Sequence, residues 1–227
     1  MNTADYHPAS GEIPMHVGII PDGGRRWAKI HNCSLQEAYQ RSRTVLRVLV
    51  DFLFNYGVKE ISIYLSSIQN FRWDPSEIDA SLGQIETSLN NELTEIASQN
   101  DLKVVIAGKL EILPASLQTA ISEIEKNTCN NTKGRLNLLI AYDPLEEIIK
   151  AFNTFAGPET FHSRLWITSP VDLVIRSGGA QLLSNFLPLQ SAYARLHFTD
   201  KLINDLLPDD LVEILRKFSI PERKFGT

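Results

Sequence analysis

Short apolar segments alternate with longer amphipathic segments along most of the chain, and this alternation strongly constrains the fold. The first apolar segment, residues 15–20, is rich in β-branched residues and runs into a proline and two glycines, a pattern typical of a buried strand followed by a turn. Strands that alternate with helices of this length form βαβ units with parallel strands. We therefore predict an α/β fold, a single domain over residues 1–227 whose mostly parallel central sheet is flanked by helices.

The same periodicities predict where the elements begin and end. Ser34 and Glu37 have the spacing of a capping box, and the amphipathic helix that follows should end at Gly57. Residues 1–14 are expected to be a flexible tail. Further strands are predicted at 60–65, 102–107, 136–141, 172–175 and 193–198, and further helices at 74–96, 114–127, 144–155 and 208–218.

Composition and charge exclude several classes of protein. The 227 residues, 43% of them hydrophobic, suffice for a core without disulfides or structural metal. Cys33 and Cys129 match no metal or redox spacing, which favours a cytoplasmic protein. We expect neither an export signal nor a membrane span, because no sufficiently long apolar run occurs. A net charge of −5 argues against a nucleic-acid partner, so any anion site must be a local cluster.

The most informative segment follows the first strand. It holds one carboxylate, two glycines, two arginines and a tryptophan, namely Asp22, Gly23, Gly24, Arg25, Arg26 and Trp27. Glycines let backbone N–H groups approach an anion, arginines grip phosphate with two hydrogen bonds, and a single carboxylate can hold a Mg²⁺ that phosphate oxygens also coordinate. The segment predicts a site for a diphosphate and Mg²⁺. The alternative is a glycine turn whose arginines pair with surface acids.

A second segment of similar composition follows the strand at 172–175. It contains Arg176, Gly178, Gly179 and Ser184, and we predict that it binds a second diphosphate. Ligands of parallel sheets bind beyond the carboxyl ends of the strands, which also brings in the loop at 66–73 with Ser67, Asn70 and Arg72. The alternative for the second segment is a tight turn with a hydroxyl cap.

Two further patterns favour structural roles. Asp209 and Asp210 follow a proline at a predicted helix start, where carboxylates stabilise the helix dipole, so we interpret them as a cap and not as a metal box. His16, His31 and His197 lack metal-ligand spacing, and we assign them core or surface roles.

These motifs resemble, in order, those of the cis-prenyltransferase family, which includes undecaprenyl diphosphate synthases. The resemblance rests on the segments 22–29, 176–180, 183–186, 193–200 and 223–226. It implies that Asp22 holds Mg²⁺ on an allylic diphosphate bound by Gly23, Gly24 and Arg26. It further implies that Ser67 and Asn70 lie near the reacting centre, and that Arg176 and Ser184 bind the second diphosphate.

The chain departs from the family pattern at several of these positions. The family has asparagine and glycine at Gly24 and Arg25, and arginine and histidine at Leu35 and Tyr39. Ala180 and Leu182 stand where it has glutamate and arginine. Arg195 replaces a glutamate that assists the metal in the family, and we expect it to bind a substrate diphosphate.

The departures are similar to those of the irregular branch of the family, the lavandulyl, cyclolavandulyl and isosesquilavandulyl diphosphate synthases. The resemblance implies head-to-middle joining of dimethylallyl or geranyl diphosphate to dimethylallyl diphosphate, with the last proton passing to the released diphosphate or to Tyr39. Bulky residues of the first long helix, Phe52 and Phe54, are expected to limit chain length.

Three alternatives remain open at this point: a regular short-chain synthase that uses isopentenyl diphosphate, a non-catalytic partner subunit of the same fold, and a prenyl diphosphate hydrolase. A homodimer is implied by the family, with 193–198 as the candidate interface.

Overall fold

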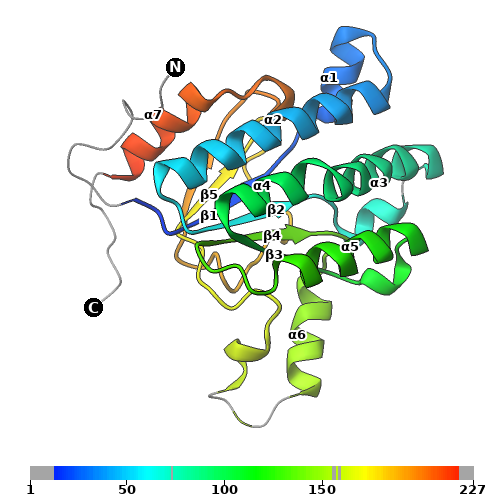
Figure 1. Cartoon of the computed structure of the whole chain (residues 1–227). Helices are drawn as coiled ribbons and strands as arrows, with labels where there is room; N and C mark the ends of the chain where they lie inside the picture. The colour runs from blue at the N-terminus through cyan, green and yellow to red at the C-terminus, as the bar shows by residue number, and fades with distance from the viewer. Residues whose placement is uncertain (1–12, 73, 155–156, 158–159, 220–227) are drawn as a thin grey trace.

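A computed structural model describes residues 13–72, 74–154, 157 and 160–219, and its core is a six-stranded sheet (Figure 1). The strand order is β3-β4-β2-β1-β5-β6, and all five neighbouring pairs are parallel. The predicted parallel α/β fold is confirmed. The strands are β1 (His16–Ile20), β2 (Glu60–Tyr64), β3 (Leu102–Ala107), β4 (Gly134–Leu139), β5 (Leu173–Arg176) and β6 (Arg195–Phe198).

Helices connect these strands. They are α1 (Gly24–His31), α2 (Leu35–Tyr56), α3 (Pro75–Asn90), α4 (Glu92–Asn100), α5 (Ala115–Thr128), α6 (Pro144–Asn153) and α7 (Pro208–Phe218). Short 3-10 turns are η2 (Ile68–Arg72), η3 (Leu110–Ile112), η5 (His162–Arg164) and η6 (Ile203–Asp205).

Two helix predictions need correction. The single helix expected over 74–96 is broken at Asn91, whose backbone (φ −123°, ψ −88°) leaves the helical region and separates α3 from α4. Helix α1 was not predicted, because only Gly24 and Ala28 of its residues are buried and no apolar stripe marks it. By contrast, α2 has the predicted start and end: Ser34 and Glu37 form the capping box, and Gly57 caps the end with a φ of 114°.

The two faces of the sheet are covered differently. Helices α2, α3, α4, α5 and α7 supply most of the helical side chains in the larger core, on the face that β1 lines with Val17 and Ile19 (Figure 1). The other face, which includes Ile20 and Val174, packs against residues of the irregular segments before and after β5, among them Ile167, Phe186 and Leu187. The prediction of flanking helices is confirmed, but loops cover much of the second face.

The described residues at the amino end correct part of the predicted tail. Ile13 packs against the core and Pro14 is buried, so these two residues belong to the folded body. Residues 1–12 and the 223–226 motif lie outside the described residues. Among the helices of the described chain, none combines the length and apolar character needed to cross a membrane.

The strand order places the predicted loops at one edge of the sheet. β1 has β2 on one side and β5 on the other, and residues Ile19 and Ile20 pair with Ile63 on one strand and Ile175 and Arg176 on the other. The segments that follow these three strands therefore meet beyond their carboxyl ends, where parallel sheets bind ligands.

Candidate active site

Asp22 lies between two arginines at the carboxyl end of β1. Its Oδ1 is 3.2 Å from Nη2 of Arg26, and its Oδ2 is 3.0 Å from Nη2 of Arg176. The Asp22 side chain is 34% exposed, so a ligand can reach the carboxylate. The predicted segments 22–27 and 176–184 are thus joined through the Asp22 carboxylate, which binds an arginine from each, although Asp22 and Arg176 are far apart in the sequence.

Arg176 is the buried member of this cluster and holds the second loop in place. Its side chain is 8% exposed, and its Nη1 donates hydrogen bonds to the Leu182 carbonyl at 2.7 Å and to Ser184 Oγ at 2.8 Å. Ser184 has a positive φ of 50°. Because Arg176 binds both Asp22 and this strained turn, its guanidinium fixes the position of one loop relative to the other.

Gly178 and Gly179 do not form the predicted anion cradle. Their N–H groups donate to the carbonyls of Lys201, at 2.7 Å, and Thr199, at 2.9 Å, and so are already used within the backbone. Both glycines have left-handed φ values, 82° and 78°. A Cβ on Gly178 would lie 2.5 Å from Nη2 of Arg26, so the glycine provides the space in which Arg26 reaches Asp22.

Substitution of Gly178 tests this role. We expect Gly178→Ala to lose about 1–2 kcal/mol of unfolding free energy from its left-handed backbone, and to raise the KM for the allylic diphosphate because the new methyl group displaces Arg26. Gly179→Ala is the matched control, since its Cβ meets only Asp200, at 3.1 Å. Thermal unfolding and steady-state kinetics should show similar stability losses but a larger KM increase in Gly178→Ala; equal KM values would contradict this role.

The turn between β1 and α1 carries two of the predicted residues. Gly23 has a φ of 114° and precedes the first turn of α1, whose N–H groups have no acceptors within the helix. A Cβ on Gly24 would lie 3.2 Å from Cε1 of Tyr39. Gly24 and Tyr39, both departures from the family pattern, are therefore neighbours, and the glycine leaves room for the ring.

Tyr39 lies beside this turn as a protonated phenol. Burial raises its pKa above the ordinary value of 10, although the positive charge of Arg25 acts in the opposite direction. The phenol is therefore a hydrogen-bond donor near neutral pH. This argues against the prediction that Tyr39 takes the last proton of the reaction.

Arg25 and Trp27 point to other neighbours. Arg25 forms an ion pair of 3.6 Å with Glu77 on α3. The Trp27 indole N–H donates to Asp205 Oδ1 at 2.9 Å, and its ring lies 4.1 Å from that of His31. These contacts tie α1 to α3 and η6. The structure thus gives Trp27 a positioning role, because its indole N–H binds Asp205 and is not directed to the Asp22 carboxylate.

The predicted residues after β2 form a compact turn at the same edge of the sheet. The Ser67 N–H and hydroxyl both donate to Asn70 Oδ1, at 2.7 and 3.1 Å. Arg72, at the end of η2, is exposed. The Asn70 side chain is therefore held by Ser67 and borders a small hollow with Leu65 and Ile78.

Arg195 does not join this cluster within one chain. It pairs with Leu173 at the amino end of β5, whereas Arg176 stands at the carboxyl end. Its Nη1 donates to the Phe218 carbonyl at 2.7 Å, and the guanidinium lies 5.0 Å from the Phe218 ring centre. The prediction that Arg195 binds a diphosphate is not supported by this position, because the side chain is engaged at the opposite end of the sheet.

Two structural interpretations are confirmed. Asp210 accepts a hydrogen bond from the Leu207 N–H at 2.9 Å, as a helix cap does. His16 is buried and lies 2.8 Å from Ser62 Oγ and 3.1 Å from the Pro170 carbonyl oxygen, which is a core role.

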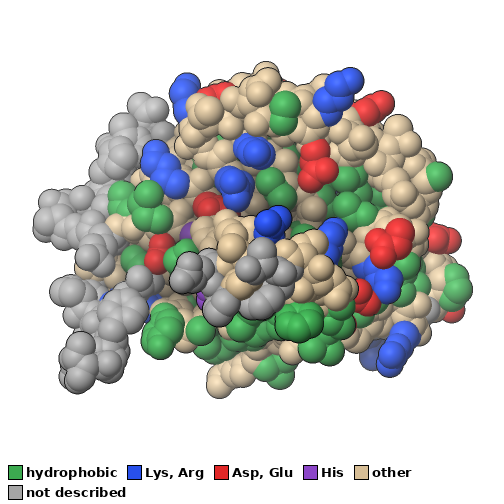
Figure 2. All heavy atoms as spheres, turned by 90° about the horizontal axis from the view of Figure 1, so that it is seen from below, with side chains coloured by type: hydrophobic (Ala, Val, Ile, Leu, Met, Phe, Trp, Pro, Cys, Tyr) green, Lys and Arg blue, Asp and Glu red, His purple; other side chains and the backbone are tan. Residues whose placement is uncertain are grey.

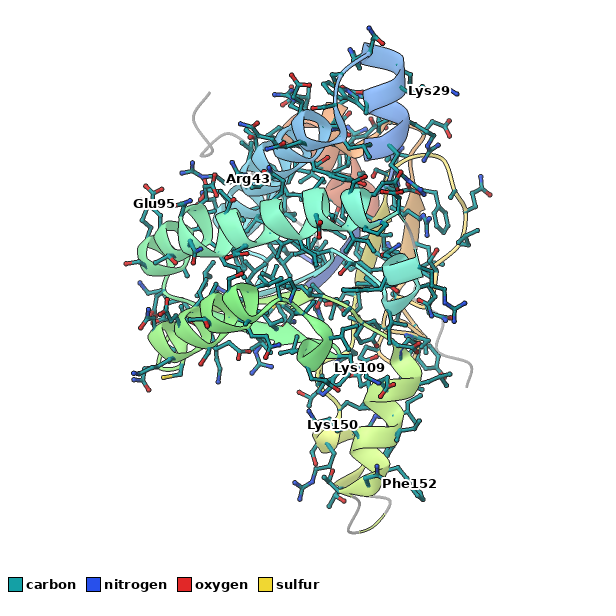
Figure 3. All side chains as sticks on the ribbon, turned by 90° about the vertical axis from the view of Figure 1, so that its right-hand side faces the viewer. Lys29, Arg43, Glu95, Lys109, Lys150 and Phe152 are labelled. Carbon is teal, nitrogen blue, oxygen red and sulfur yellow. The ribbon has the colours of Figure 1, made fainter. Side chains whose placement is uncertain are left out.

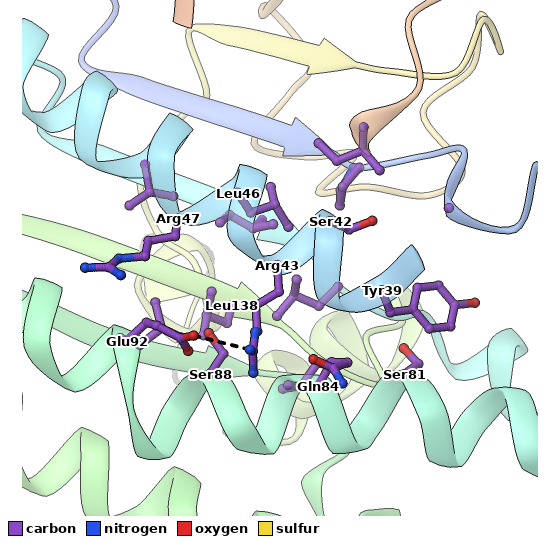
Figure 4. A pocket seen from close by; sticks show the side chains of 18 residues that line it. Tyr39, Ser42, Arg43, Leu46, Arg47, Ser81, Gln84, Ser88, Glu92 and Leu138 are labelled. Carbon is purple, nitrogen blue, oxygen red and sulfur yellow. Dashed lines mark ion pairs between the residues drawn. The ribbon is translucent and has the colours of Figure 1, made fainter. Parts of the chain in front are cut away.

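A pocket of about 140 Å³ opens beside this cluster, between α2 and the helix pair α3 and α4 (Figure 4). Gly24 and Tyr39 line one end, and Leu46, Ile63 and Leu138 supply apolar walls. Phe52 and Phe54 do not line it. Both pack in or against the main core, so the prediction that they limit chain length is wrong.

Sequence reasoning missed the polar residues that line this pocket between its two ends, among them Arg43, Gln84 and Glu92. A signal was available. Arg43 interrupts the stripe Tyr39, Leu46 and Val50 at helical spacing, and Ser81, Ser88 and Glu92 repeat the same spacing on the facing helices.

The donor set fits Mg²⁺ if a ligand supplies most of the oxygens. No group of three or more metal-binding side chains exists among the described residues, and Asp22 is the carboxylate at this edge that faces both arginines. Mg²⁺ is commonly held by one or two carboxylates together with phosphate oxygens and water. Asp22 would hold the ion together with a bound diphosphate.

The fold and the site define a class: a parallel α/β enzyme with an arginine-flanked carboxylate next to a largely apolar pocket that Pro21 and Gly24 line. The family model Prenyltransf, described as "Putative undecaprenyl diphosphate synthase", matches residues 20–226. The chain belongs to this family and is a prenyltransferase.

Relatives and solved structures agree with this assignment. The isoprenyl transferase of Rickettsia prowazekii is 32% identical, over 93% of this chain and 97% of the relative. The tritrans,polycis-undecaprenyl-diphosphate synthase (geranylgeranyl-diphosphate specific) of Thermoplasma acidophilum is 31% identical, over 94% and 89%. A crystal structure of lavandulyl diphosphate synthase from Lavandula x intermedia, in complex with dimethylallyl diphosphate, superposes with a TM-score of 0.90 at 31% identity, over 95% of this chain and 99% of that one.

Proposed function

We propose that the protein is a Mg²⁺-dependent prenyl diphosphate synthase that joins an allylic diphosphate to dimethylallyl diphosphate by head-to-middle condensation. The observation that carries the proposal is the cluster of Asp22, Arg26 and Arg176, whose carboxylate lies in the same turn as Pro21 and Gly24, two residues that line the largely apolar pocket. A diphosphate would bind at the cluster and its hydrocarbon chain would enter the pocket.

Two findings favour irregular condensation over chain elongation. The structural match to lavandulyl diphosphate synthase extends over nearly the whole chain, and that structure contains dimethylallyl diphosphate. Three of the departures from the family pattern, Gly24, Arg25 and Tyr39, also lie together beside the Asp22 turn, where Gly24 leaves room for the Tyr39 ring and Arg25 reaches Glu77. Substitutions at Gly24, Arg25 and Tyr39 would change the side chains that surround C1 of the allylic diphosphate.

The proposed reaction breaks the C1–O bond of the allylic diphosphate and forms a C–C bond to the double bond of the second dimethylallyl diphosphate. Arg26 and Arg176 stabilise the negative charge that develops on the leaving diphosphate. When bound at Asp22, Mg²⁺ supplies further positive charge there. The apolar walls keep water from the allylic cation, and the released diphosphate accepts the proton that is lost last, since Tyr39 is protonated.

A regular short-chain synthase is the second candidate. It is favoured by the relatives at 31–32% identity, whose names are those of isoprenyl transferases and undecaprenyl diphosphate synthases. Such an enzyme would require isopentenyl diphosphate as the acceptor. Product analysis with each acceptor separates the two candidates.

We further propose a cytoplasmic homodimer. Cys33 and Cys129 are free thiols, as expected in a reducing compartment. Leu145, Ile149 and Phe152 are exposed along α6, which projects from the body in Figure 1, and hydrophobic side chains are visible over that face in Figure 2. Phe152 is labelled at the tip of α6 in Figure 3. A second copy would cover these side chains or those of the predicted interface at 193–198, where Tyr193 and Leu196 are exposed. Sedimentation velocity measures whether a dimer forms.

A further inference from the structure

An ion pair crosses the interior of the pocket where a hydrocarbon chain would pass. Arg43 extends from α2, and its Nη2 lies 3.4 Å from Glu92 Oε1 on α4. Their side chains are only 16% and 24% exposed. Figure 4 shows Arg43 reaching across to Glu92, between Tyr39 at one end of the pocket and Arg47 at the other.

Arg43 and Glu92 leave several buried polar atoms without hydrogen bonds, and burial of such atoms costs folding free energy. Nε and Nη1 of Arg43, Oε2 of Glu92 and Oε1 of the neighbouring Gln84 are buried and have no hydrogen-bond partner among the described residues. Buried ionic groups rarely stabilise a fold by themselves, and replacement by apolar side chains is often neutral or favourable. A charged pair at this position therefore needs an explanation other than stability.

The dimensions of the pocket suggest that explanation. Its volume is about 140 Å³, and a cavity of about 150 Å³ in another protein holds a single benzene molecule. Arg43 follows Tyr39 by one helical turn, a rise of about 6 Å along α2. Beyond Arg43 the pocket continues toward Val50 and Leu93. The rise of about 6 Å from Tyr39 to Arg43 therefore suits one isoprene unit.

We propose that Arg43 and Glu92 form a partition that restricts the allylic donor to the five-carbon dimethylallyl group. This inference rests on the proposed function, in which the pocket holds the donor chain. A longer chain would have to displace the pair or place hydrocarbon against its unpaired polar atoms, and either change costs free energy. The partition makes Arg43 and Glu92 specificity-determining residues.

The test is binding of unreactive thiolodiphosphate analogues of dimethylallyl, geranyl and farnesyl diphosphate, with Mg²⁺, measured by calorimetry. The wild type should prefer the dimethylallyl analogue over the farnesyl analogue, and in the double variant Arg43→Ala, Glu92→Ala that preference should fall by about tenfold. Alanine maintains both helices. A second variant, Arg43→Met, Glu92→Leu, replaces the pair with apolar bulk that is expected to fold well, and its preference should also fall.

Arg47 and Glu95 provide the matched control. They form a 3.3 Å ion pair between the same two helices, but their side chains are 45% and 54% exposed, and Arg47 lies one turn beyond Arg43. Arg47 lines the far end of the pocket, so the control variant is Glu95→Ala alone, which breaks this exposed pair without changing a lining residue and should leave the wild-type preference unchanged. An unaltered preference in both folded Arg43 and Glu92 double variants would overturn the partition, whereas failure of the wild type to bind any analogue would overturn the proposed function itself.

Discussion

Asp22→Ala should lower turnover by about a thousandfold, because one change removes the carboxylate available to Mg²⁺ and the partner of two arginines that face the leaving group. In the wild type, Asp22 lies 3.2 Å from Arg26 and 3.0 Å from Arg176. Steady-state rates over a Mg²⁺ titration measure the effect. A folded variant with near-normal rate and saturable Mg²⁺ dependence would refute the assignment of Asp22.

Two further variants separate this chemical role from folding. Asp22→Asn keeps the shape of the side chain but lacks the charge, and its one carbonyl oxygen can accept from only one of the two arginines, which bind different oxygens of Asp22. This variant should fold and remain nearly inactive. Asp172 is the matched control, since its Oδ2 accepts from the backbone N–H groups of Met15 and His16 at the opposite end of the same two strands. Asp172→Asn should retain the wild-type rate.

Arg176→Leu should have the second largest effect, and it should reduce both activity and stability. The substitution removes the hydrogen bonds to Asp22, the Leu182 carbonyl and Ser184 Oγ. An orphaned buried acceptor costs about 1–3 kcal/mol, and loss of charge beside the leaving group costs about a hundredfold in rate. Thermal unfolding and single-turnover kinetics measure the two losses independently.

Arg176→Lys and Ser184→Ala define what the guanidinium does. A lysine ammonium is a compact charge that cannot reproduce the planar arrangement of the arginine donors. If Arg176 acts by joining the two loops, Arg176→Lys should remain strongly impaired and Ser184→Ala, which removes a single acceptor, only mildly so. Full recovery of the rate in Arg176→Lys would show that charge alone suffices.

The parallel sheet and its ligand-binding edge were predictable from the sequence because both follow from local patterns. Apolar β-branched runs that end in glycine turns mark the strands, and the Ser34 capping box marks the start of α2. Arg26 and Arg176 were predicted as anion-binding residues of two loops at this edge, but their contacts with Asp22 were not predicted. That Arg176 contacts this carboxylate depends on the pairing of β1 with β5, a long-range contact without a local signal.

The predictions that failed did so for physical reasons that local patterns do not contain. Arg195 was assigned by motif position, but it lies at the amino end of β6, where the Phe218 carbonyl is its acceptor. The segment with Gly178 and Gly179 has a composition suited to anion binding. The N–H groups of both glycines nevertheless donate to carbonyl oxygens of the residues that follow β6, and so are not available to a ligand. Phe52 faces the core, whereas Arg43 on the same helix faces the pocket.

The central claim, head-to-middle condensation, is tested most directly by analysis of the products formed with Mg²⁺ from three substrate mixtures. These are dimethylallyl diphosphate alone, dimethylallyl with geranyl diphosphate, and dimethylallyl with isopentenyl diphosphate. We predict a branched or cyclised ten-carbon diphosphate from dimethylallyl diphosphate alone. Linear cis products formed only when isopentenyl diphosphate is present would contradict it and identify a regular synthase, and release of a prenyl alcohol would identify a hydrolase.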